Sequence, residues 1–308
     1  GHVAAEIRAL ANMGAGIDDP VESSKISRQA YDLAMRVGNV NLARWSRESI
    51  RFGAFLRADG WDEAMAEVWA DVDALFGGGG SLTDEARWIN TTVSIRVHRG
   101  LPVDELLERL DEIAAEVSDP IVSSEVLSHR AQMAMVAGDY ATAARLNEAA
   151  ADLGSQVTFI YLSFALRSLL LAHDLEGARA MAIRHHKESQ ANRIDEAFDI
   201  GAAASIAALE GRTDEAIAGY REAFERLAAI HEDWLMAMLG FEVVALVGAD
   251  HPFVREVAAR SRTIFERVGA RPWLANLDAL LASSPSENPG KAASAPKADS
   301  RPVEARPA

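Results

Sequence analysis

The sequence contains no cysteine, so neither a disulfide nor a thiolate metal site can form. It also contains no long apolar run. The longest candidate, residues 163–172, is interrupted by Arg167 and falls short of the about 18 residues that a membrane-spanning helix needs. These absences favour a reducing, cytoplasmic environment and predict that the chain has no membrane partner.

Basic residues are in the minority. The chain has 31 Lys and Arg against 46 Asp and Glu, which gives a net charge of −15 over 308 residues. A surface of this charge repels the phosphate backbone unless basic side chains cluster locally. We therefore expect no nucleic-acid partner.

Motifs that carry chemistry are missing as well. Gly77–Gly80 is glycine-rich, but no Lys-Ser/Thr pair follows it, as a phosphate-binding loop requires. We interpret residues 77–81 as a hinge. Neither H-E-x-x-H nor G-x-S-x-G occurs. The sequence thus predicts a non-enzyme with no cofactor and no metal ion.

A well-formed amphipathic helix is present at Gly211–Leu227. Thr213 stands where a helix cap is expected, and Asp214 and Glu215 place negative charge at the positive helix end. Six residues at helical spacing then form one apolar stripe: Ala216, Ile217, Tyr220, Ala223, Phe224 and Leu227. Such a stripe needs neighbouring helices to cover it.

The same design recurs along the chain. Breaks or helix starts follow one another at intervals of 36 to 40 residues, at Gly60, Gly100, Gly138, Asp174, Gly211 and Gly248. A period of this length is typical of repeated helical hairpins. We predict an all-α solenoid of about six to seven hairpins over residues 1–282. Residues 283–308, rich in Ser, Pro, Ala and Lys, are predicted to be a disordered tail.

The hairpins resemble tetratricopeptide repeats. In such repeats a small residue early in the second helix precedes an aromatic residue, then Ala and Phe, as Ala216, Tyr220, Ala223 and Phe224 do here. The other units follow the pattern more loosely. The resemblance implies a tetratricopeptide-like α-solenoid.

Residues 259–274, ARSRTIFERVGARPWL, are similar to the closing segment of large bacterial signalling ATPases. In that family a helical-repeat region follows the ATPase module, with a nucleotide cyclase domain in front or a helix-turn-helix domain behind. No helix-turn-helix pattern occurs in this sequence, which favours the cyclase-linked branch. Since the chain begins Gly-His-Val without Met, we interpret it as part of a larger protein.

Three arginines share one face of a predicted helix at residues 41–58: Arg44, Arg47 and Arg51. With Arg87 on the next first helix they could line a groove for an acidic peptide, because guanidinium groups favour carboxylate partners. The alternative is intramolecular pairing with nearby acids (Glu48, Glu63, Glu67 or Glu85), which is the ordinary state of charges on a helix.

Two further groups of residues have competing interpretations. His185 and His186, with Asp195, Glu196 and Asp199 on the next helix, either bind a metal ion or form a polar packing seam, and we favour the seam. The tryptophans Trp45, Trp61, Trp69 and Trp88 are expected in the core, with Trp61 the candidate for exposure.

These observations predict a non-catalytic interaction and regulatory domain. Its partner would be a protein or peptide, with an acidic one as the candidate that the arginines favour, or other domains of the parent chain. The alternative is a small-molecule sensor with a pocket inside the superhelix.

Overall fold

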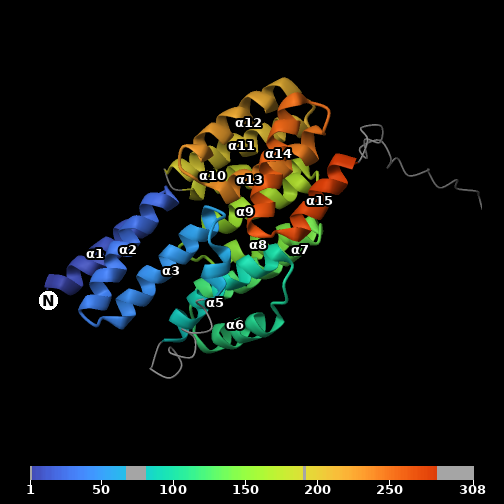
Figure 1. The fold of residues 1–308 in the computed structure, drawn as a ribbon. Helices are drawn as coiled ribbons and strands as arrows, with labels where there is room; N and C mark the ends of the chain where they lie inside the picture. The colour runs from blue at the N-terminus through green and yellow to red at the C-terminus, as the bar shows by residue number, and fades with distance from the viewer. Residues whose placement is uncertain (1, 67–80, 190–191, 283–308) are drawn as a thin grey trace, which may run out of the picture.

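A computed structural model describes residues 2–66, 81–189 and 192–282 (Figure 1). These residues form helices and no strand, which confirms the all-α prediction. Residues 61–66 are helical. The other helices are α1 (His2–Ala15), α2 (Pro20–Arg36), α3 (Val40–Leu56), α5 (Leu82–Arg99), α6 (Asp104–Glu116), α7 (Pro120–Val136), α8 (Tyr140–Asp152), α9 (Thr158–Leu171), α10 (Leu175–Glu188), α11 (Arg193–Leu209), α12 (Thr213–Ala228), α13 (Asp233–Val247), α14 (Pro252–Val268) and α15 (Arg271–Ala282).

Helices that follow one another pack as pairs. The closest packing joins α11 to α12, α2 to α3, α8 to α9 and α7 to α8. First helices of successive pairs also touch, so that α3 meets α5, α5 meets α7, and α9 meets α11. This arrangement of stacked hairpins is that of a helical-repeat solenoid. The stripe on α12 is buried along its whole length, as its spacing predicts.

The predicted repeat signals fall at turns that contain a residue with a positive φ angle. All five glycines among these signals have one: Gly60, Gly100, Gly138, Gly211 and Gly248. In the remaining unit His173, which precedes the helix-capping Asp174, takes this place with a φ of 58°. A side chain with a Cβ is strained there, whereas glycine is not.

Replacing this histidine should therefore stabilise the protein. We expect His173→Gly to raise the free energy of unfolding by about 1 kcal/mol, because the strain of a left-handed L-residue exceeds the entropic cost of glycine. Chemical denaturation measures the gain. Gly138→Ala is the matched control: no atom of the described residues lies within 4 Å of the added Cβ, so its expected loss comes from φ alone. If His173→Gly lowered the free energy of unfolding, the prediction of backbone strain at His173 would be wrong.

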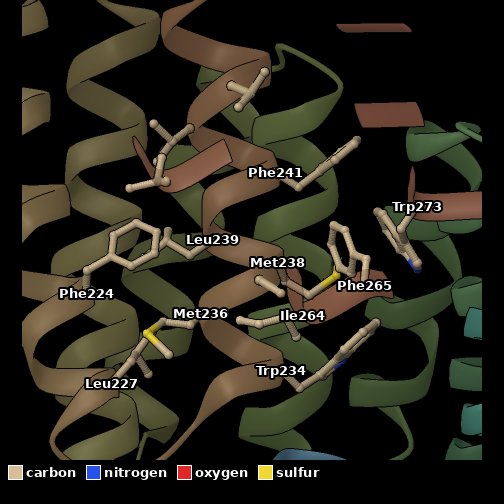
Figure 2. Packing of buried hydrophobic residues seen from close by; sticks show 14 of the residues in the cluster. Phe224, Leu227, Trp234, Met236, Met238, Leu239, Phe241, Ile264, Phe265 and Trp273 are labelled. Atoms are coloured by element: carbon tan, nitrogen blue, oxygen red, sulfur yellow. The ribbon is translucent and has the colours of Figure 1, made fainter. Parts of the chain in front are cut away.

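The chain closes on itself at its C-terminal end. Helix α13 packs against α3 and α9, and α15 packs against α5. Trp234 of α13 lies 5.6 Å from Phe55, 5.0 Å from Trp61 and 4.7 Å from His98, measured between ring centres. Figure 2 shows Trp234 beside Ile264 and Phe265, with Trp273 further along. The inner space next to α3 and α5 is thus filled by the last helices of the chain.

Polar contacts join the same segments. The Nε1 of Trp273 donates to the Nδ1 of His98 at 3.1 Å, and burial lowers the pKa of His98 to about 3. The imidazole therefore stays neutral and can accept this hydrogen bond. Arg267 donates to the carbonyl of Ala58 at 2.9 Å. These hydrogen bonds fix the position of the last helices against α3 and α5.

Two predictions concern residues outside the described ranges. The glycines of the proposed hinge, residues 77–80, and the proposed tail, residues 283–308, both lie there. Ser81, at the edge of the hinge, caps α5 by accepting a hydrogen bond from the Asp84 amide at 3.2 Å. Among the described helices, none combines the length and apolarity needed to cross a bilayer.

Candidate interaction surface

The predicted arginine stripe spans α3 and α5, which are neighbours. Arg44, Arg47 and Arg51 do lie on one face of α3. The guanidinium carbons of Arg47 and Arg51 lie 5.8 and 4.7 Å from the ring centre of Trp88 on α5, whereas Arg44 and Arg47 are only partly buried. The part of this face at Arg47 and Arg51 therefore meets α5.

Arg51 corrects the prediction of a groove lined by all four arginines, because it is only 2% exposed. Its Nε donates to the carbonyl of Ala64 at 3.0 Å, and its Nη2 to the hydroxyl of Thr92 at 2.7 Å. Its Nη1 pairs with Glu48 at 2.6 Å. This pairing is the intramolecular alternative, and it leaves Arg51 as a structural link between α3, α5 and residues 61–66.

Arg87 is different, because it is exposed. Its guanidinium carbon lies 5.8 Å from the ring centre of Trp45, within the range of a cation–π contact. Trp45 is 40% exposed. Phe52, seven residues further along the same face of α3, is 45% exposed. We name Trp45, Phe52 and Arg87 the Trp45 surface.

We expected Trp61 to be the exposed tryptophan, but among the described tryptophans the exposed one is Trp45. Trp61 is 2% exposed, and its Nε1 donates to the Phe55 carbonyl at 3.4 Å. Trp88 is equally buried, as predicted, whereas Trp45 reaches solvent. Trp69 lies outside the described residues. The closure by α13 explains the burial of Trp61, because Trp234 covers it.

Two carboxyl groups lie beside the Trp45 surface. Glu48 accepts hydrogen bonds from Arg51 and from the Thr91 hydroxyl, and burial raises its pKa although Arg51 opposes the shift. Glu125 of α7 accepts from Asn90 at 3.1 Å, and its other oxygen is buried without a hydrogen-bond partner in the part of the chain that the structure describes.

Burial raises the pKa of Glu125 to about 8; Glu48 and Asp119 add to the rise and Arg87 opposes it. Glu125 therefore keeps its proton at neutral pH, and Arg87 is the most exposed of the four predicted arginines.

No sequence pattern pointed to Glu48 and Glu125 as perturbed groups. Each is an ordinary glutamate within a helix, and its burial depends on how the neighbouring hairpins pack against that helix. The exposure of Phe52 was missed for the same reason.

The histidine pair is organised around one carboxylate. The Nδ1 atoms of His185 and His186 lie 3.0 and 3.1 Å from the two oxygens of Asp199. His185 is fully buried against Phe198, whereas His186 is 79% exposed, so only His185 lies in the predicted packing seam. Glu196 instead pairs with Arg226, and Asp195 bonds to Asn192. Within the described ranges no three His, Asp or Glu residues are grouped to hold a metal ion.

A small-molecule sensor would need a pocket inside the superhelix that is large enough for its ligand. Between α9, α11 and α13 a cavity of about 20 Å³, lined by Arg167 and Glu242 among others, has room for one water molecule. A cavity of about 380 Å³ lies on the outside, beside Ser155 and Arg184.

No family model matches the chain, and no curated protein matches it.

Proposed function

We propose that this chain is a non-catalytic interaction domain that binds a protein or peptide through the Trp45 surface. The observation behind this proposal is the exposed pair of Trp45 and Arg87, with Phe52 on the same face of α3. Tryptophan and arginine are the residues most enriched among those that dominate binding energy in protein interfaces. An exposed pair of this kind is a ready anchor point.

The chemistry of the surface favours an acidic partner. Arg87 offers a planar set of donors that suits a carboxylate, and Trp45 and Phe52 offer apolar area beside it. The nearby Glu125 carries a proton at neutral pH, so it adds little negative charge that would repel such a partner. A peptide with Asp or Glu next to an apolar side chain fits this arrangement.

The parent protein is a separate part of the proposal. The resemblance of residues 259–274 supports a place in a large bacterial signalling ATPase, where the domain would relay partner binding to an ATPase or cyclase domain. Those residues fall in α14 and α15, and they pack inward through Phe265 and Trp273. The segment thus serves the closure of the fold, and the partner would bind elsewhere, on α3 and α5. The sensor alternative is less favoured, because the cavity between α9, α11 and α13 has room for one water molecule and the larger cavity lies on the outside.

Peptide selection tests the binding surface. A random peptide library is selected on the wild-type protein, and enriched peptides are synthesised with a fluorescent label. We expect Asp or Glu in the enriched sequences, and Kd at least about tenfold higher for Trp45→Ala and for Arg87→Glu, as hot-spot substitutions produce. Fluorescence anisotropy measures each Kd.

Ile183→Ala is the matched control, because Ile183 is 61% exposed on α10, away from α3 and α5. It should leave Kd unchanged. Circular dichroism establishes that each variant is folded. Failure to enrich any peptide, or equal binding by Trp45→Ala and wild type, would overturn the proposal.

A further inference from the structure

The tip of the first hairpin touches the C-terminal half of the chain. Asp18, between α1 and α2, accepts a hydrogen bond from the backbone amide of Arg193 at 2.9 Å. Asp19 uses one carboxylate oxygen to cap α2, accepting from the Val21 amide at 2.9 Å. Its other oxygen lies 3.0 Å from Nδ1 of His231, in the turn before α13. Residues more than 170 positions apart therefore meet at this junction.

A buried acid lies at the centre of the contact. Glu232 directly precedes α13 and is 0% exposed. Neither of its carboxyl oxygens has a hydrogen-bond partner among the described residues. A buried carboxylate in this position has lost its water without gaining donors, which disfavours its charged form.

The surrounding charges work in the same direction. Burial raises the pKa of Glu232 to about 8, and the nearby carboxylates of Asp19, Asp18 and Asp233 contribute to the rise. Of these, Asp233 is paired with Arg267 at 2.6 Å, and Asp19 with His231. The charged and titratable groups around the junction are Asp18 and Asp19 before α2, Arg57 after α3, Arg193 on α11, His231 and Asp233 at the start of α13, and Arg267 on α14.

We propose that this junction is a proton-dependent latch: protonated Glu232 lets the tip of the first hairpin dock on the turn before α13, and loss of that proton releases the tip. In the docked state the neutral acid can be buried beside Asp18 and Asp19. Once ionised, it is repelled by both, and the separation of the two segments admits the water that its charge needs.

The direction of the pH effect follows from proton linkage. Glu232 has its ordinary pKa of 4.5 when the junction is open and a pKa of about 8 when it is closed. The closed form therefore binds more protons between these values. Docking is strongest below the lower pKa, weakens as pH rises from there, and stops weakening above about pH 8.

The absence of cysteine makes a direct distance measurement simple, since two introduced cysteines are the only sites for spin labels. Asn12→Cys on α1 and Glu225→Cys on α12 are exposed positions on either side of the junction. Double electron–electron resonance should show a docked distance at about pH 6 that gives way to longer distances by about pH 8.5, reversibly, and no further change above about pH 9.

Two variants distinguish the latch from a general effect of pH. Glu232→Gln mimics the protonated acid and should hold the docked distance over the whole range. Glu222→Gln is the matched control: it removes an exposed carboxylate on α12 that pairs with Arg226, and it should keep the wild-type response. An unchanged wild-type distance, or a Glu232→Gln protein that opens like wild type, would overturn the proposal.

Hydrogen exchange of the unlabelled protein keeps the test valid if Glu232→Gln does not fold. After correction for the intrinsic pH dependence of exchange, residues 14–22 and 229–236 should lose protection between about pH 6 and about pH 8.5, while α8 keeps its own. Equal behaviour of the junction and α8 would count against the latch.

Discussion

Trp234→Ala should lower the free energy of unfolding by about 3–5 kcal/mol, the range expected when a buried Trp is truncated in a packed core. Trp234 is 4% exposed and contacts rings from α3, α5, α14 and residue 61. Its removal opens a cavity where the last helices meet the N-terminal half, in the cluster shown in Figure 2. Denaturation by urea, followed by circular dichroism, measures the loss.

Trp45→Ala is the comparison that separates burial from residue type. Trp45 is the same residue at 40% exposure, so its truncation should cost well under half as much. A second measurement, limited proteolysis, should detect α13–α15 being cut earlier in Trp234→Ala. If both substitutions cost the same, Trp234 does not carry the closure.

The second large effect is expected at a buried ion pair between α9 and α13. The Nε of Arg167 lies 3.2 Å from a Glu242 oxygen, and the two side chains are 8% and 3% exposed. Ser205 donates to the other Glu242 oxygen, and the Tyr220 hydroxyl donates to Ser205 at 2.9 Å. Removing Arg167 leaves the charge of Glu242 buried and unpaired. Arg167→Met should therefore lower the free energy of unfolding by about 3–5 kcal/mol near pH 8.

Restoring neutrality should recover most of this loss. Burial already raises the pKa of Glu242 against the opposing effect of Arg167, so in Arg167→Met the acid takes up a proton more readily. The deficit should shrink as pH falls from about 8 to about 5, and the double variant Arg167→Met/Glu242→Gln should approach wild type.

Arg226→Met controls for the loss of an arginine, since Arg226 pairs with Glu196 and Glu222 at 43% exposure and should cost less than about 1 kcal/mol. A deficit of Arg167→Met that is the same at both pH values, and that the double variant does not relieve, would show that packing rather than charge is lost.

The fold could be predicted because it rests on local information. Helical spacing of apolar residues and a break every 36 to 40 residues specify helical hairpins wherever they occur. The position of His173 shows the limit of that information: its left-handed backbone takes the place of a glycine in other units, and no residue preference signals it.

The closure and the candidate surface depend on non-local packing, which the spacing does not encode. The periodicity predicts that Arg44, Arg47 and Arg51 share one face of α3. It does not predict which neighbouring helix that face meets. The same holds for Trp61, which is buried only because Trp234 arrives from a segment far along the chain. Trp45 escapes that cover and is left as an exposed aromatic.

The docking of α13 and α15 on α3 and α5 changes how this repeat protein must fold. In an open repeat array each unit depends only on its neighbours, so units can form and melt almost independently. Here Arg267 reaches Ala58, and Trp273 reaches His98, across more than half of the chain. Contacts of such sequence separation slow the folding reaction and tie its two ends into a single cooperative transition. The chain therefore has the local sequence pattern of a linear repeat protein, but we expect it to unfold as cooperatively as a globular domain.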